Sequence, residues 1–111
     1  MADLERLSQI AMEIIAYSGV AKSTYIEAAR LAREGNFEQA QEQILQGDEV
    51  LKTAHETHMQ LLQKEAAENT PQVSMLVLHA EDQFMSCETI KVLVLEIIEI
   101  YKKRYTHSLV I

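Results

Sequence analysis

An imidazole and a carboxylate stand three residues apart in "VLHAEDQFM", residues 77–85, a stretch that is otherwise largely apolar. The two groups are His79 and Asp82. A neutral imidazole at an accessible edge is a nucleophile that can accept a phosphoryl group. An ionised carboxylate inside an apolar interface has to be protonated, paired or metal-bound, because an isolated buried charge costs too much free energy. The pair therefore indicates a nucleophile beside a charge that needs a partner.

Helical spacing places the two side chains on different faces of one helix. Asp82 falls on a line of apolar residues, whereas His79, about 60° round the helix, shares a polar line with Gln72, Gln83 and Ser86. We therefore expect Asp82 to point into an interface and His79 to lie at its accessible edge. Asp82 could also orient the ring of His79. The spacing alone equally fits an ion pair for Asp82 with a Lys or Arg, and a surface or packing role for His79.

The other histidines and the single cysteine are weaker candidates for chemistry. His55 and His58 lie on adjacent faces of one predicted helix, and the chain has no Glu-x-x-His metal motif, so we expect packing roles. Cys87 is expected to be an inert buried thiol, because it falls on the predicted core line of the helix that carries His79, which runs Leu76, Ala80, Phe84, Cys87, Ile90, Val94. The chain has no glycine-rich phosphate loop and no hydrolase pattern of serine, histidine and aspartate or of paired carboxylates.

Three long helices separated by two breaks must position these residues. Gly35 is predicted to end the first helix, and Asn36 to cap the second in a capping box. Asn69 or Thr70 is expected to cap the third, which would begin at Pro71. The predicted helices cover about residues 4–34, 37–68 and 71–105, and residues 106–111 are predicted to be a frayed tail.

Composition and short connections predict an all-α fold. The chain has 111 residues and is expected to form one small domain over residues 1–105. Of its residues 48% are hydrophobic, and only 3 Gly and 1 Pro are present to mark turns. Short connections force antiparallel neighbours, which gives an up-down-up three-helix hairpin or bundle. Gly19 and Gly47 each cost about 1 kcal/mol inside a helix relative to Ala, so we expect close helix–helix approach at both.

The third predicted helix is apolar around most of its circumference. In "IKVLVLEIIEIY", residues 90–101, only Lys91, Glu96 and Glu99 are polar. Two partner helices cannot cover such a surface, so we expect a homo-oligomer of cyclic symmetry with this helix near the axis. Each copy would then bring Asp82 to the axis, where a hard divalent cation such as Mg²⁺ would relieve the repulsion between carboxylates.

Charge and segment composition exclude several classes of partner. The 17 acidic and 10 basic residues give a net charge of −7, which argues against nucleic-acid binding. The start "MADLER" has acids where a signal peptide needs positive charge, and no run reaches the ~18 apolar residues of a membrane span. With a single cysteine and no disulfide framework, we expect a soluble cytoplasmic protein that does not insert into membranes.

Three stretches together resemble the lactose/cellobiose-type enzyme IIA components of the bacterial sugar phosphotransferase system, over roughly residues 8–105. They are "IAMEIIAYSGVAKSTYIEAARLAREGNFEQA", "AHETHMQLLQKEA" and the most specific, "LVLHAEDQFM". The resemblance implies a homotrimer of three-helix subunits, nine helices in all. It implies that His79 accepts a phosphoryl group from the phosphocarrier HPr and passes it to a cysteine of a cognate enzyme IIB, which serves the membrane IIC permease. It also implies that Asp82 binds a divalent cation, Mg²⁺ being the expected ion, on the trimer axis.

The chain departs from the family pattern, which commonly reads His-Ala-Gln-Asp-His-Leu-Met. The changed positions here are Glu81, Gln83 and Phe84, with His58 and Met59 in place of a Gln-Thr pair in the second helix. Gln83 replaces a second histidine and, one turn from His79, is expected to donate a hydrogen bond to the phosphoryl group. Glu81 is expected to add negative charge close to that site.

Two alternatives to a phosphocarrier fit the same residues. One is a non-catalytic or regulatory trimeric interaction module that has lost phosphotransfer. The other is a metal-binding helical oligomer that uses Asp82 and nearby histidines. Phosphate uptake on His79 would distinguish the phosphocarrier from both alternatives.

Overall fold

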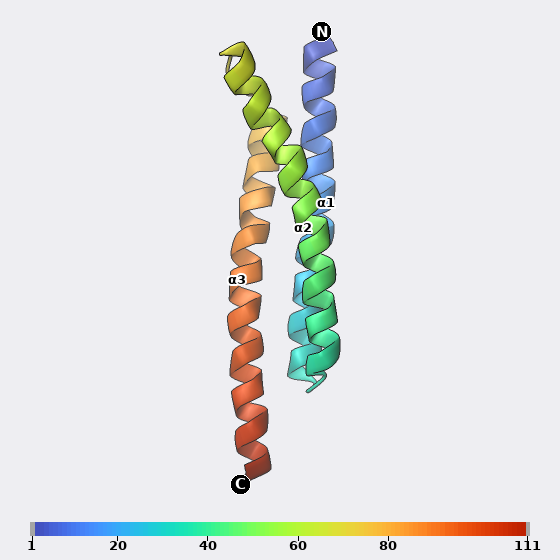
Figure 1. Cartoon of the computed structure of the whole chain (residues 1–111), viewed down its shortest axis with the longest axis vertical. Helices are drawn as coiled ribbons and strands as arrows, with labels where there is room; N and C mark the ends of the chain where they lie inside the picture. The colour runs from blue at the N-terminus through green and yellow to red at the C-terminus, as the bar shows by residue number, and fades with distance from the viewer. Residues whose placement is uncertain (1, 111) are drawn as a thin grey trace.

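Three long helices make up the computed structural model, which describes residues 2–110 and places side chains for residues 4–107. They are α1 (Ala2–Arg33), α2 (Phe37–Glu68) and α3 (Met75–Val110). Figure 1 shows α1 and α2 running antiparallel and α3 returning beside them along the 65 Å axis of the molecule. The described residues contain no strand, so the predicted all-α, up-down-up bundle is confirmed.

The turn between α1 and α2 has the backbone conformation predicted for it, but it lacks the predicted side-chain capping hydrogen bond. Gly35 adopts φ of 82°, which favours glycine, and its N–H donates to the carbonyl of Ala32 at 3.0 Å. The N–H of Asn36 reaches back to the carbonyl of Leu31 at 2.9 Å, which completes a Schellman motif. Asn36 occupies the N-cap position of α2, but its side chain makes no cap hydrogen bond, so the predicted capping box does not form.

The second break lies further along the chain than predicted. Asn69 takes the left-handed conformation (φ 50°) that ends α2, a role its short polar side chain tolerates. α3 then begins at Met75, where the Oγ of Ser74 accepts a hydrogen bond from the N–H of Val77 at 3.2 Å. The predicted start at Pro71 is therefore wrong, because the serine rather than residue 69 or 70 caps the helix.

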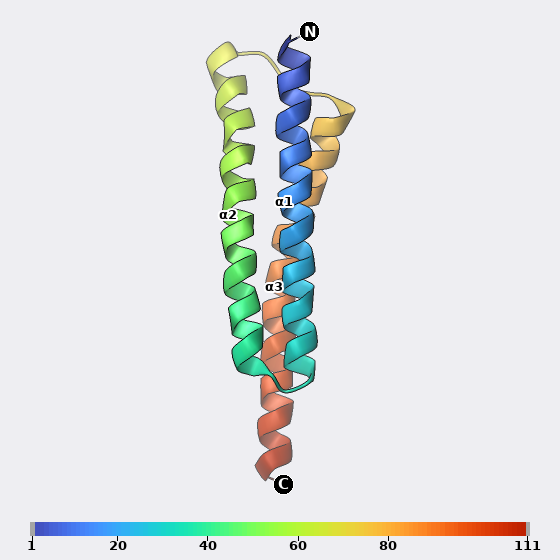
Figure 2. The ribbon, with the colours of Figure 1, turned by 90° about the vertical axis from the view of Figure 1, so that its right-hand side faces the viewer.

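The carboxyl end of α3 runs past the turn between the other two helices (Figure 2). The helix continues to Val110, so the tail predicted for residues 106–111 is helical as far as residue 110, and Ile111 lies outside the described residues. Among the described helices, none has an apolar stretch long enough to cross a bilayer.

α1 lies between the two other helices and packs along both of them, whereas α2 and α3 touch each other only sparsely. The predicted core line of α3 is confirmed. Its buried members are Ala80, Phe84, Cys87 and Val94. They pack against buried α1 side chains such as Ile14 in one cluster and Tyr25 in another.

A polar contact links all three helices around the buried ring of Tyr25. Its hydroxyl donates to Asp48 Oδ1 at 2.6 Å, and Lys91 Nζ lies 2.8 Å from the same oxygen. Burial and this bond to Asp48 raise the pKa of Tyr25 far above its usual value of 10.0. A Cβ on Gly47 would lie 2.7 Å from the ring, so the close approach predicted there is confirmed. At Gly19 no neighbouring atom lies within 4 Å of such a Cβ, so the close helix–helix approach predicted at Gly19 is not present in this chain and that prediction is wrong.

Candidate functional site

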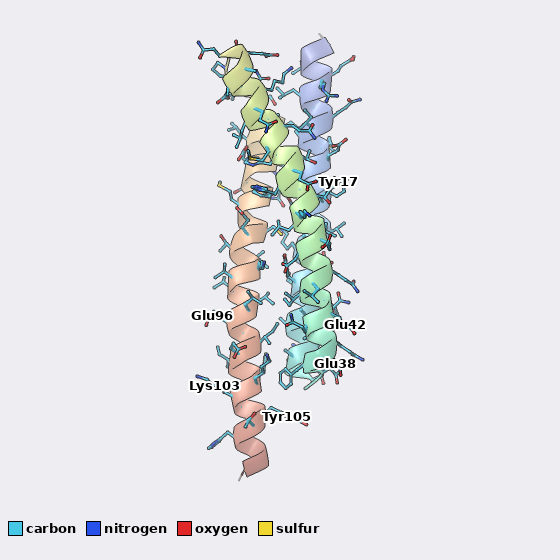
Figure 3. The ribbon with its side chains drawn as sticks, viewed as in Figure 1. Tyr17, Glu38, Glu42, Glu96, Lys103 and Tyr105 are labelled. Carbon is cyan, nitrogen blue, oxygen red and sulfur yellow. The ribbon has the colours of Figure 1, made fainter. Side chains whose placement is uncertain are left out.

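α3 exposes a long apolar face that neither of the other helices covers. Its large members are between 38% and 59% exposed: Leu78, Met85, Val92, Leu93, Leu95, Ile97 and Ile100. On the same helix, Glu96 projects away from α1 and α2 (Figure 3). A single chain therefore leaves in solvent the kind of surface that proteins normally bury against a partner.

Asp82 lies within this exposed face, between Leu78 and Met85 on the same line of the helix. Its side chain is exposed, and among the described residues 4–107 it has no ion pair or hydrogen bond. Within these described residues no Lys or Arg pairs with Asp82. Burial of Asp82 in an interface stays a prediction, because it requires another copy of the chain.

His79 lies at the edge of the exposed face, as its position on the polar line predicts. The ring is exposed, and no described side chain forms a hydrogen bond with it, Asp82 included. The imidazole is therefore open to a protein partner, and its nitrogens are free to act as a nucleophile. The catalytic role itself stays a prediction.

Gln83 lies one helical turn after His79 and meets a cation from α1. Lys22 Nζ donates to Gln83 Oε1 at 3.4 Å, and both side chains are half-buried. The bond uses the amide oxygen of Gln83, so its NH₂ group remains a donor beside the imidazole. Lys22 is missing from the sequence-based site, since nothing in the local pattern relates it to a residue 61 positions later.

Glu81 turns to the opposite flank of α3 and binds α2. Its Oε1 lies 2.6 Å from Nε2 of His58, and since an ionised carboxylate only accepts, the ring nitrogen donates. The His58 ring also stacks on Phe84, with centroids 4.8 Å apart and planes at 19°. The predicted packing role of His58 is confirmed. The carboxylate of Glu81 is bound by His58, and the expectation that it adds negative charge close to the site of His79 stays a prediction.

His55 makes a looser contact with the same ring. It is exposed, its centroid lies 6.1 Å from that of Phe84, and the two planes meet at 28°. Unlike His58 it forms no hydrogen bond to a described side chain, so it contributes packing alone.

One chain does not assemble a metal site within its described residues. No group of three or more His, Cys, Asp or Glu side chains there could hold a metal ion. Mg²⁺ binds through several oxygen ligands, and Asp82 offers a single unpaired carboxylate. A cation at Asp82 would therefore need oxygen ligands from outside these described residues. Cys87 is buried as predicted, and burial raises the pKa of its thiol, an effect that the charge of Lys22 only partly offsets.

Comparison with known proteins places this geometry in a family. Residues 9–102 match the family model described as "PTS system, Lactose/Cellobiose specific IIA subunit". The oligo-beta-mannoside-specific EIIA component of the phosphotransferase system of Bacillus subtilis is 35% identical over 96 residues, which cover 86% of this chain and 87% of that protein. The likeness therefore extends over nearly all of both chains.

Solved structures agree with the sequence comparison. The cellobiose-specific enzyme IIA from Bacillus anthracis superposes with a TM-score of 0.85 at 35% identity, covering 88% of this chain and 90% of that one. A chain in the solution structures of the IIA(Chitobiose)–HPr complex of Escherichia coli gives 0.80 at 29% identity, covering 89% and 96%. Because the family model covers residues 9–102 and the Bacillus subtilis relative is 35% identical over 96 residues, the chain belongs to the lactose/cellobiose-specific IIA subunits of the phosphotransferase system.

Proposed function

We propose that the chain is a cytoplasmic phosphocarrier that accepts a phosphoryl group from HPr on His79 and passes it to a cysteine of a lactose/cellobiose-type enzyme IIB. The observation that carries this proposal is the exposed imidazole of His79, free of any described side-chain partner. The similarity to a IIA chain solved in complex with HPr supports HPr as the donor. Onward transfer would serve sugar uptake through the membrane IIC permease.

Phosphoryl transfer to His79 requires little covalent chemistry from the rest of the chain. A ring nitrogen of His79 attacks the phosphorus in line with the bond to HPr. The new N–P bond forms as the old bond breaks, and the bonding electron pair leaves with HPr. Charge then lies mainly on the three equatorial oxygens of the transferred group. The Lys22 ammonium, which lies 3.4 Å from the amide oxygen of Gln83, and the free amide N–H groups of Gln83 are the donors available to stabilise that charge.

The exposed face of α3 supports a further part of the proposal, a homotrimer with α3 nearest the axis. Three copies would bury apolar side chains such as Leu78 and Met85, each more than half exposed in one chain. The same arrangement would bring three Asp82 carboxylates together. Mg²⁺ bound there would supply charge neutralisation, and the chain's part is to present the carboxylate between apolar side chains such as Leu78 and Met85.

A transfer chain rebuilt from purified proteins tests the carrier role. Labelled protein is isolated after exposure to phosphorylated HPr and then mixed with a lactose/cellobiose-type enzyme IIB. We expect the label to leave the chain and to appear on IIB, and a Cys→Ser variant of IIB at its acceptor to prevent this. Label that stays on the chain would refute the carrier role. If the chain takes up no label from active HPr, the alternative of a non-catalytic interaction module would be favoured instead.

A further inference from the structure

Two side-chain interactions fasten the site segment of α3, residues 79–84, to the neighbouring helices. On one flank Gln83 meets Lys22 of α1 at 3.4 Å. On the other flank Glu81 accepts from His58 of α2 at 2.6 Å. His79 precedes both attached residues in the same stretch of helix, so the orientation of this stretch decides where its ring lies relative to Gln83 and Lys22.

The attachment to α2 matters because α2 and α3 contact each other sparsely elsewhere. In the view of Figure 1 the carboxyl half of α2 passes in front of the start of α3, and His58 contacts Glu81 and Phe84 across these two helices. Here the His58 side chain is only 13% exposed, against 32% for Glu81, and the imidazole covers Phe84 at 4.8 Å. A short hydrogen bond to a carboxylate in partly buried surroundings is among the stronger polar contacts in proteins.

The two residues also stand where the sequence departs from the family pattern. Glu81 lies in the site motif and His58 in the second helix, 23 positions apart, yet the two changes meet in one contact. The two departures therefore form one contact between α2 and α3.

We propose that His58 is a positioning residue for the phosphoryl site, which acts by holding Glu81 and Phe84 so that Gln83 stays within reach of Lys22. This proposal rests on phosphoryl transfer to His79, and it assigns His58 no contact with the phosphoryl group. Without His58, Glu81 loses its partner, and the part of α3 that carries His79 and Gln83 loses its hydrogen bond to α2.

Transfer kinetics from phosphorylated HPr provide the first test, at a temperature where circular dichroism shows every variant folded. We expect His58→Ala to lower kcat about tenfold with KM for HPr unchanged, because a small misplacement of reacting groups affects the transition state and not docking. His58→Gln keeps an N–H donor for Glu81 and should recover most of the rate. His55→Ala is the matched control. It removes a histidine that stacks on the same Phe84 ring but forms no hydrogen bond to a described side chain, so it should behave as wild type.

A second variant series separates positioning from general stability. If His58 acts through the contact of Gln83 with Lys22, Lys22→Ala should slow transfer less in the His58→Ala background than in wild type. Additive effects of the two changes would refute the proposal. So would wild-type kcat in His58→Ala, a change confined to KM, or failure of His58→Gln to recover the rate.

Hydrogen exchange gives a result that does not depend on transfer. We expect the amides of residues 79–84 to exchange faster in His58→Ala and at the wild-type rate in His55→Ala. Unchanged exchange in His58→Ala would overturn the proposal even if transfer is slow. If wild type takes up no phosphate, the phosphocarrier function fails while the exchange result still decides whether His58 positions the segment.

Discussion

Alanine substitution at the two glycines inside α1 and α2 should change stability in opposite directions. At Gly47 the new Cβ would lie 2.7, 2.9 and 3.0 Å from three atoms of the Tyr25 ring. Tyr25 is fully buried and bound to Asp48 at 2.6 Å, so the ring cannot turn aside without losing that bond. At Gly19 the Cβ would meet no atom within 4 Å, so the same substitution adds only helix propensity.

The magnitudes follow from opposing contributions at each position. Replacing Gly by Ala in a helix interior stabilises by about 1 kcal/mol. Overpacking a filled core costs about 1–3 kcal/mol, and weakening the bond from Tyr25 to Asp48 costs about 1 kcal/mol more. We therefore expect Gly47→Ala to lower the free energy of unfolding by about 2 kcal/mol, and Gly19→Ala to raise it by about 1 kcal/mol.

Urea unfolding followed by circular dichroism at 222 nm measures both changes, with all three proteins at one concentration because oligomerisation would shift apparent stability. Equal slopes with respect to urea would show that the variants unfold the same structure. A Gly47→Ala protein as stable as wild type would refute the packing of Tyr25 on α2. A destabilised Gly19→Ala protein would contradict the open space beside α1.

Three further predictions follow from Asp82, Tyr25 and Cys87. Millimolar Mg²⁺ should raise the unfolding temperature of wild type but not of Asp82→Asn, and a rise in both would refute a cation at this carboxylate. The pKa of Tyr25 is raised in the folded state. The protonated hydroxyl therefore contributes its full stabilisation below pH 10.0, the pKa in the unfolded chain. Above that pH the free energy of unfolding should fall by about 1.4 kcal/mol per pH unit. Tyr25→Phe should lack this component in urea titrations between pH 10 and 11, and an identical pH slope would contradict the assignment. Because burial raises its pKa, Cys87 should react with iodoacetamide at pH 8 far more slowly in folded protein than in urea, and equal rates would show an accessible thiol.

The helical architecture was predictable because it depends on local signals. Apolar residues at intervals of three and four define the buried line of α3, and Gly35 followed by Asn36 marks the first turn in a way that few other sequences would. The second turn was less predictable, since Asn69 and Ser74 are both good capping residues. Only the left-handed backbone at Asn69 shows that it ends one helix instead of starting the next.

The candidate site was predictable only along α3 itself. The position of His79 at an accessible edge and the proximity of Gln83 follow from helical periodicity. The partners of the site segment come from other helices: Lys22 lies 61 positions from Gln83, and His58 lies 23 positions from Glu81. Periodicity within one helix does not encode which residues of its neighbours it meets, so these contacts required the packed structure.

The most direct test of the central claim is transfer of labelled phosphate from phosphoenolpyruvate, through enzyme I and HPr, to wild-type protein and to His79→Ala. We expect acid-labile label on wild type and none on the variant, with circular dichroism showing that both are folded. Wild type without label, while HPr is labelled, would contradict the phosphocarrier function. Label that persists on His79→Ala would show that another residue accepts the phosphoryl group.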